Sequence, residues 1–365
     1  MFERRLYYHI DWAMIAALMA LCALGLVNIY SATTLPGGDA SRVYWMQIYG
    51  IVLGLVALAV ALTIDYRTLC DKSHFIYLGI VALLLYVYFF GAVRGGSRRW
   101  IDLGMFNLQP SEFAKAVLAL ALAKFFGESR RGALTHVDLA IGAAITAVPF
   151  LIVARQPDLG TAVTLLPVVF AIAFVAGMPM KIVGVIALAG VLAAPVAWKF
   201  ALQDYQKERI ETFLDPSQDA KGAGYQQIQA RITVGSGGLW GKGFKEGTQG
   251  QLRFLPVAHN DFIFSVQAEE YGFAGVLAAL GLYLFVILRA LESARLAKDR
   301  LGAYLVVGVL ASFTFQVIYN ITMSAGLAPV KGLTLPLMSY GGSSMIATLV
   351  GFGLILNVRM RRFTN

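Results

Sequence analysis

The residues best suited to chemistry lie at the start of one long apolar segment, within RFLPVAHNDFIFSVQAEEYGFAG, residues 253–275. His259, Asn260 and Asp261 stand at its beginning, and Glu269 and Glu270 follow about two helical turns later. An ionisable side chain in or beside a membrane span is costly unless it pairs with an opposite charge or faces a polar cavity. Asp261 has no lysine or arginine within one helical turn, so it is the candidate general base.

The two glutamates are a different case. If the helix started at Asp261, Glu269 would lie roughly 80° around it from Asp261, and Glu270 would be on the opposite face. Asp261 and Glu269 therefore do not form a close carboxylate pair, and both glutamates are interpreted as mainly structural.

Three further stretches carry charge beside apolar runs: residues 91–117, 155–161 and 331–344. They contain both signs, with cations Arg94, Arg98, Arg99, Lys115, Arg155 and Lys331 and acids Glu112 and Asp158. A cavity with this mixture could bind a diphosphate through its cations and keep one carboxylate free as a base. Structural alternatives stay open: Glu112 and Lys115 at i, i+3 can simply neutralise each other, and Arg94 and Arg98 suit lipid headgroups or loop contacts.

The elements that must position these residues are membrane spans. The 365 residues are 58% hydrophobic and 14% charged, against about 45–50% and about 25% in soluble domains. A helix needs roughly 20 apolar residues to cross a bilayer. The sequence predicts an all-α polytopic membrane protein of ten spans in a single domain, 1–365, with spans at about 12–31, 44–64, 74–93, 110–126, 137–154, 160–177, 180–201, 261–290, 302–326 and 335–358.

The first span is expected to be retained, because its apolar run exceeds the roughly 7–15 residues of a signal peptide. Ten spans put both termini on one side. With a cytoplasmic N-terminus, the inner segments hold fifteen lysines and arginines and the short outer ones six, which favours cytoplasmic termini. The net charge of +9 is then mainly a topology signal, and nucleic acid is not an expected partner.

In this topology the three charged stretches and the segment that carries Asp261 all lie on the outer side. A long loop, 202–260, lies there as well. Loops of this length are usually functional. This one is expected to contain short amphipathic helices on the membrane. Within it, "GSGGLWGKG" does not meet the phosphate-loop pattern, which requires glycine at Ser236 and serine or threonine at Gly243, so no nucleotide site is expected.

Other motifs carry little chemistry. The four histidines are scattered and indicate no zinc site, and Cys22 and Cys70 are not expected to form a disulfide. Gly50 and Gly54 have the small-xxx-small spacing typical of packed membrane helices. Pro336 and Gly341–Gly342 predict a broken start to the last span, which is tolerated only where it lines a cavity or is buried in protein.

Several motifs, in order from about residue 94 to 344, resemble the SEDS family (shape, elongation, division and sporulation): "RRWIDLG", "QPSEFAK", "QPDLGT", "GAGYQQIQARITVGSGGLWGKG" and "LPLMSYGGSS". "GKGFKEGTQGQL" is similar to the rod-shape-determining branch, RodA, whereas "KGLTLPLMSYGGSS" is closer to the division branch, FtsW. The RodA branch is favoured, because the long outer loop that contains its motif distinguishes the two branches better.

The resemblance implies a glycosyltransferase of the cytoplasmic membrane that polymerises lipid II into peptidoglycan. It implies a class B penicillin-binding transpeptidase and other elongation-complex membrane proteins as partners, and a divalent cation (Mg²⁺ or Mn²⁺) as an assisting cofactor. The essential carboxylate matches Asp261. The substrate-binding candidates are Arg99, Gln109, Ser111, Glu112, Lys115, Asp158 and His259. Val257 and Asn260 depart from the family pattern, which has glutamate and threonine there.

The expected reaction is a single displacement. Asp261 takes the proton from the GlcNAc 4-hydroxyl of one lipid II, whose oxygen attacks the anomeric carbon of the growing strand and expels undecaprenyl diphosphate. Lys115 and Arg99 are expected to stabilise that diphosphate. Two alternatives stay open: a flippase that moves lipid II across the membrane, and a scaffold for the transpeptidase.

Overall fold

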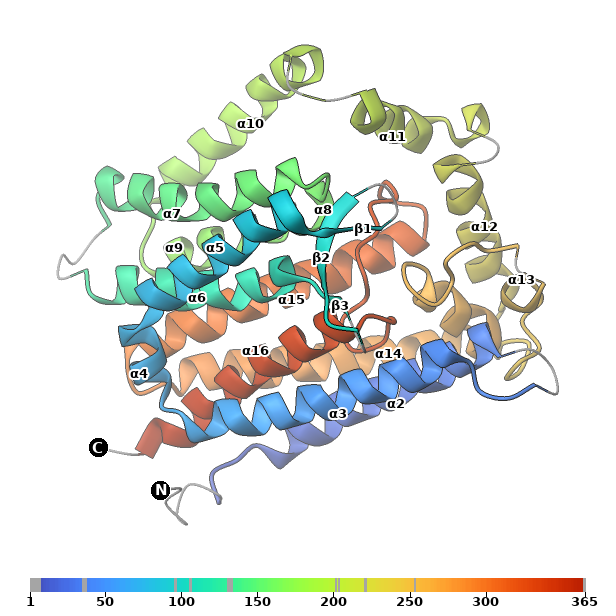
Figure 1. Ribbon diagram of the computed structural model, residues 1–365, viewed down its shortest axis with the longest axis horizontal. Helices are drawn as coiled ribbons and strands as arrows, with labels where there is room; N and C mark the ends of the chain where they lie inside the picture. Colours follow the sequence, from blue (N-terminus) through green and yellow to red (C-terminus); the bar gives the residue numbers. More distant parts are fainter. Residues whose placement is uncertain are drawn as a thin grey trace.

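A computed structural model describes residues 8–34, 38–94, 97–104, 107–129, 134–200, 202, 204–219, 222–252 and 254–363. Apart from α10 (Met180–Phe200), which slants away from the rest, the long helices run side by side along one axis, with both termini at one end and the longest loop at the other, here called the loop end (Figure 1). The helices are α2 (Trp12–Thr33), α3 (Arg42–Thr63), α4 (Tyr66–Asp71), α5 (Ser73–Phe90), α6 (Pro110–Gly127), α7 (His136–Arg155), α8 (Leu159–Val163), α9 (Leu166–Val175), α10 (Met180–Phe200), α11 (Asp204–Leu214), α12 (Ala223–Ser236), α13 (Thr248–Gln251), α14 (Ile263–Arg295), α15 (Arg300–Ser324) and α16 (Gly342–Met360).

Within the described residues, eight helices are long and apolar enough to cross a membrane: α2, α3, α5, α7, α10, α14, α15 and α16. The other two predicted spans are helical as well. Helix α6 carries Glu112, Lys115 and Lys124 and is less apolar, and the sixth span is divided into α8 and α9. The chain is therefore an all-α, multi-pass membrane protein, as predicted.

Helix α16 is the most buried of these helices and packs against α3. The backbones approach closely at Gly50, where a Cβ would lie 3.1 Å from the Cα of Gly342. A side chain at Gly54 would also meet Leu349. The interpretation of Gly50 and Gly54 as a packing motif is confirmed, and the contact fixes the wall of the site described below.

Two helices begin inside their predicted spans, and the predicted broken start of the last span is confirmed. Helix α14 begins at Ile263, so Asp261 lies in the preceding turn and the angle of 80° to Glu269 does not apply. Helix α16 begins at Gly342 rather than residue 335, because Leu337 (φ +70°) and Gly341 (φ +160°) are not helical. The buried backbone before it is satisfied by side chains: Tyr283 donates to the Pro336 carbonyl at 2.6 Å and Gln47 to that of Ser339 at 3.0 Å.

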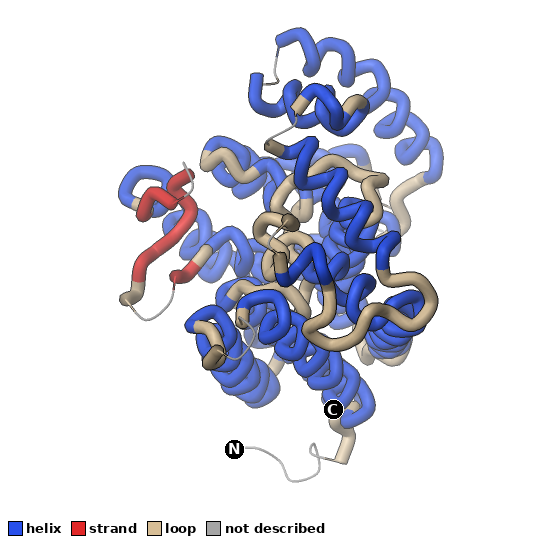
Figure 2. The backbone as a smooth tube through the Cα atoms, turned by 90° about the vertical axis from the view of Figure 1, so that its right-hand side faces the viewer, coloured by secondary structure: helices blue, strands red, loops and turns tan. Residues whose placement is uncertain are grey.

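The basic stretch after α5 forms two short strands. Strands β1 (Ala92–Arg94), β2 (Ser97–Asp102) and β3 (Asn107–Leu108) form a small antiparallel sheet at the margin of the bundle (Figure 2). Gly95 and Gly96 lie outside the described residues. Pairing with β1 and β3 extends the chain from Ser97 to Asp102 and places Arg99 on a rigid element.

The long loop contains α11, α12 and α13, in agreement with the expected short helices. Its glycine-rich stretch contacts an interruption in α14 at Gly272, where φ is +63°. Lys242 and Gly243 donate their backbone N–H groups to the Glu269 and Glu270 carbonyls at 2.9 and 3.0 Å, and Phe273 N donates to Gly238 O at 2.9 Å. The backbone groups freed by the interruption are thereby paired, as a buried helix break requires.

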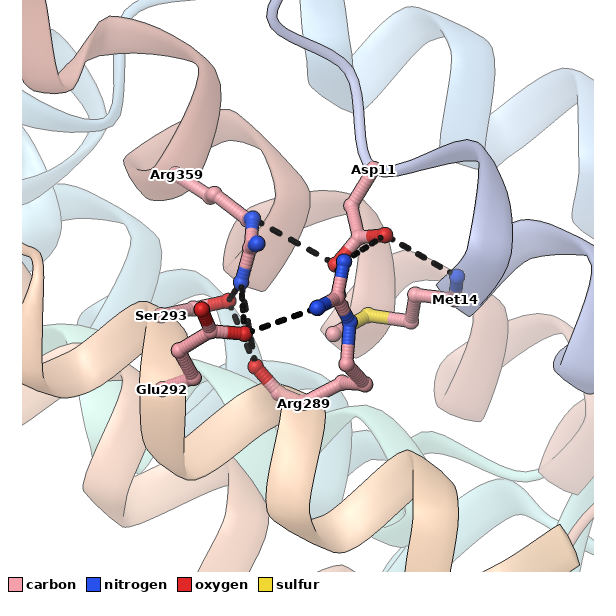
Figure 3. A network of polar contacts seen from close by, with 6 residues as sticks. All are labelled: Asp11, Met14, Arg289, Glu292, Ser293 and Arg359. Atoms are coloured by element: carbon pink, nitrogen blue, oxygen red, sulfur yellow. Dashed lines mark hydrogen bonds and ion pairs between the residues drawn. The ribbon is translucent and has the colours of Figure 1, made fainter.

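The end that carries the termini is held by a charged network (Figure 3). Arg289 binds both carboxylate oxygens of Asp11, at 2.7 and 3.0 Å, and Arg359 approaches the same carboxylate at 3.3 Å. Glu292 accepts from both guanidinium groups at 2.9 and 3.0 Å. Two cations and two acids thus join the start of α2 to the ends of α14 and α16.

Candidate active site

Asp261 lies at the loop end, in the turn that precedes α14. The turn is held by Asn320 of α15, whose side-chain amide donates to the carbonyls of Asp261 at 2.9 Å and Leu333 at 2.6 Å. The Asp261 carboxylate has no ion pair with any described residue. Burial raises its pKa to about 6, although Arg209 and Arg99 act in the opposite direction. It is thus a base with a pKa closer to neutrality than an ordinary aspartate.

The carboxylate opens onto a cavity of about 870 Å³. Its polar wall includes Asp261, Arg99, Gln109, Glu112 and Asp158, which come from β2, α6 and the turns before α8 and α14. The structure therefore brings together five of the eight residues singled out in the sequence.

Asp158 is the centre of a polar network in this wall. Arg99 approaches it at 3.6 Å, Gln109 donates to it at 3.0 Å, and it caps α8 by accepting from Thr161 N at 3.1 Å. Burial raises its pKa, against the effect of Arg99 and of the hydrogen bonds with Thr161. Gln109 also donates to Ser111 at 3.1 Å, so Ser111 lies behind it and does not line the cavity.

Lys115 is not in the cavity wall. It donates to Glu112 at 2.7 Å and to Gln316 of α15 at 2.8 Å, one helical turn deeper than Glu112. The spacing correctly predicted the ion pair, but the ammonium group points toward α15 and not toward the space where a substrate would bind. Direct stabilisation of a diphosphate by Lys115 therefore has no support in this geometry.

His259 is also outside the cavity wall. Its ring packs against Tyr340, with 5.8 Å between the centroids, and its carbonyl accepts from Tyr340 N at 2.9 Å. Burial lowers the pKa of His259, so the ring is neutral at pH 7. Its contacts are those of a residue that holds the turn against the segment before α16.

The opposite wall of the cavity is apolar. Met46, Tyr49 and Leu53 of α3 line it, and so does Leu103. Tyr49, Leu53 and Leu103 are exposed, with fractions of 56%, 45% and 52%, on a surface that faces lipid in a membrane protein. The cavity therefore connects a polar floor with a flank open to the bilayer, which suits an amphiphilic molecule that keeps its tail in the membrane.

The described residues contain no group of three or more histidine, cysteine, aspartate or glutamate side chains able to hold a metal ion. Asp158 and Glu112 are engaged by Arg99 and Lys115. Asp261 is the carboxylate of the wall that has no ion pair among the described residues, and no step below depends on a divalent cation.

The two glutamates of α14 are structural, as interpreted. Glu269 accepts from Lys242 Nζ at 2.7 Å and from Gln249 N at 3.0 Å. Glu270 accepts a hydrogen bond from Ser31 of α2. Glu269 therefore holds the long loop against α14, and Glu270 holds α2 against α14. Cys22 and Cys70 are free and buried, as expected.

Sequence reasoning missed Gln316, Asn320 and Ser343. Ser343 accepts from Gln109 N at 3.0 Å and donates to the Asn107 carbonyl at 2.7 Å, which joins α16 to the sheet. A signal existed for the first two: Gln316 and Asn320 are polar residues at i, i+4 within an apolar span, a pattern that marks a face turned toward protein or a cavity.

Comparison with known proteins decides the family. A family model described as "Cell cycle protein", covering FtsW, RodA and SpoVE, matches residues 11–363. The chain belongs to the FtsW/RodA/SpoVE family. This confirms the resemblance found in the motifs.

Members of the FtsW/RodA/SpoVE family match over nearly their whole length. Peptidoglycan glycosyltransferase MrdB of Escherichia coli K12 is 38% identical over 355 residues, 97% of this chain and 94% of that protein. A solved structure described as "Structural coordination of polymerization and crosslinking by a peptidoglycan synthase complex" has a TM-score of 0.85 at 34% identity, covering 98% of this chain and 99% of that one. Thermus thermophilus RodA has a TM-score of 0.72 at 32% identity, covering 98% of each chain.

Proposed function

We propose that this chain is a peptidoglycan glycosyltransferase that polymerises lipid II at the outer face of the cytoplasmic membrane during cell elongation. Its relatives are glycosyltransferases by name. The observation that carries the proposal is Asp261: a carboxylate without an ion pair among the described residues, at the boundary between a polar cavity floor and a flank open to lipid.

In the proposed reaction, Asp261 removes the proton from the GlcNAc 4-hydroxyl of one lipid II. The oxygen attacks the anomeric carbon of the lipid-linked strand, the bond from that carbon to the diphosphate breaks, and its electron pair leaves with undecaprenyl diphosphate. An α-linked donor that yields a β-linked product needs one inversion, hence one base and no covalent intermediate.

The remaining polar residues of the wall bind and orient. Arg99 contributes positive charge next to Asp261, and Gln109, Asp158 and Glu112 provide hydrogen-bonding groups for sugar hydroxyls. The apolar flank along α3 accepts the start of a polyprenyl chain, whose remainder stays in the bilayer. Lys115 acts through Glu112, whose orientation it maintains.

The expected location is the cytoplasmic membrane, with both termini in the cytoplasm and the loop end outside. A class B penicillin-binding transpeptidase is the proposed partner. Support comes from the likeness to a chain in a synthase complex that coordinates polymerization and crosslinking.

The decisive experiment is polymerisation of purified lipid II in detergent, with and without the transpeptidase. Asp261→Asn keeps the size of the side chain and removes the base, so the rate is expected to fall by at least about 100-fold. Asp204→Asn removes an exposed carboxylate of α11 and is expected to match the wild type. Near-normal polymerisation by Asp261→Asn would disprove the assignment, and a wild-type protein that makes no polymer would favour the flippase.

A further inference from the structure

A second, smaller cavity of about 150 Å³ adjoins the first. It lies between α11, the turn before α8 and the segment that precedes α16. Arg99, Asp158 and Gly332 line both cavities and form the wall between them. Two cations line the small cavity alone, Arg209 of α11 and Lys331.

The two cavities differ in charge. The charged side chains around the large one are Arg42, Arg99, Glu112, Asp158 and Asp261, with more acids than cations. Those around the small one are Arg99, Arg209, Lys331 and Asp158. The sequence suggested one cavity containing both the cations and the base. In the structure, Arg99 lines both cavities, Arg42 lines the large one alone, and Arg209 and Lys331 line the small one alone.

Arg209 and Lys331 form no close ion pair with a described acid, although Arg209 acts electrostatically on Asp261. The Arg209 guanidinium donates instead to the Val330 carbonyl at 3.3 Å. Burial and the nearby Arg209 lower the pKa of Lys331, as expected for two cations held close together. Arg209 is exposed and Lys331 is partly buried, so both cations can be reached by an anion that enters the small cavity.

The small cavity is also placed correctly with respect to Asp261. The wall at Gly332 has no side chain, and a Cβ there would lie 3.6 Å from the Asp261 carboxylate. In an inverting displacement the leaving group departs from the face of the carbon opposite to the attacking oxygen. The base and the leaving group therefore belong on opposite sides of the reacting carbon. The two cavities, which meet at Gly332, provide two such sides.

We infer that the small cavity binds the diphosphate of the donor lipid, through Arg209 and Lys331. This inference rests on the proposed function and adds to it the site of the leaving group. The diphosphate diester carries two negative charges, and a further charge develops as the bond to the sugar breaks; both cations then stabilise the departing oxygen. Leu202 and Ile210 provide an apolar border for the first part of the polyprenyl chain.

The test uses geranylgeranyl diphosphate as a probe, in direct binding to the full-length protein and as a product-like inhibitor of polymerisation. In the double variant Arg209→Gln/Lys331→Gln, the Kd and the inhibitory concentration are both expected to rise at least tenfold. The charge-retaining pair Arg209→Lys/Lys331→Arg is expected to recover most of the affinity. Lys207→Gln removes a cation from the same helix that pairs with Asp204 and does not line the cavity, so it should stay within twofold of wild type.

Binding to the Asp261→Asn protein separates this inference from the proposed function. That variant is expected to bind the probe at least as tightly as the wild type, because it removes a nearby negative charge, while its polymerisation rate falls at least about 100-fold. The inference is overturned if the double variant binds the probe as tightly as the wild type. It is also overturned if inorganic pyrophosphate binds wild type and double variant equally, or if micellar phosphatidylglycerol displaces the probe at an equal concentration, since the site would then be a general surface for anionic headgroups.

Discussion

At the scale of single residues, the distinctive feature is an acid that is surrounded by protein and yet has no ion pair among the described residues. Asp261 could be found from the sequence because no cation stands near it along the chain. Burial moves its pKa toward neutrality, which makes it a stronger base than a solvated aspartate.

The pH dependence of the reaction follows from this shift. A carboxylate whose pKa is raised to about 6 is active as a base above that value and protonated below it. The value of kcat/KM is therefore expected to fall about tenfold per pH unit below pH 6 and to level off above it. Arg209 and Arg99 hold the pKa down, so Arg209→Gln should move the midpoint upward. Steady-state polymerisation from pH 4.5 to 8 measures both, and a midpoint that stays near 4 would contradict the assignment.

The rest of the site was only partly predictable. The spacing of Glu112 and Lys115 predicted their ion pair, since i, i+3 neighbours meet on a helix. It could not show that Lys115 points toward Gln316, because that depends on how α6 packs against α15. Arg209 could not be found at all, since α11 reaches the site through a loop whose path leaves no local pattern in the sequence.

At the scale of elements, the interruption of α14 connects the membrane domain to the long loop. The apolar pattern predicted the span, but not its break. A glycine in a membrane helix is common, and the partner that stabilises the break, residues 237–243, is far away in sequence. The turn that carries Asp261 lies before the first residue of α14, on the N-terminal side of this break.

A pair of glycine substitutions on α14 tests this junction. Gly272→Ala is expected to destabilise the protein by at least about 2 kcal/mol, because φ is +63° and a Cβ would collide with Gly241. Gly281→Ala lies on the same helix with nothing within 4 Å of the added Cβ, so no loss is expected there. Thermal unfolding in detergent compares the two. Equal Tm values would mean that the break does not need glycine.

At the scale of the whole molecule, Asp261 precedes the start of α14, whereas Arg289 near the other end of that helix pairs with Asp11, so the site and the termini lie at opposite ends. The counts of lysine and arginine in short loops predict which end faces the cytoplasm. Because each span crosses the membrane in the direction opposite to the one before it, the direction of every helix follows from its place in the order of spans. The arrangement of the helices around one another could not be predicted in this way, because all of them are apolar on several faces.

Labelling with a membrane-impermeant maleimide in intact cells tests the orientation. The native Cys22 and Cys70 are 1% and 0% exposed and should give no background. Asp204→Cys, at the loop end, is expected to react, and Asp71→Cys, near the termini, is expected to react only after the cells are opened; the two side chains are 107% and 72% exposed. The reverse pattern would invert the predicted topology.

The network around Asp11 has a consequence for the rival function. Parting α2, α14 and α16 at the termini would strip a buried carboxylate of two guanidinium partners, a cost of about 3–5 kcal/mol for such a pair. This network holds the helices together at the end of the termini, whereas the cavity that contains Asp261 opens at the loop end. A carrier with alternating access must open at each end in turn. In this molecule the end of the termini is closed by ion pairs, and a polymerase needs only one open end, through which substrates enter and product leaves.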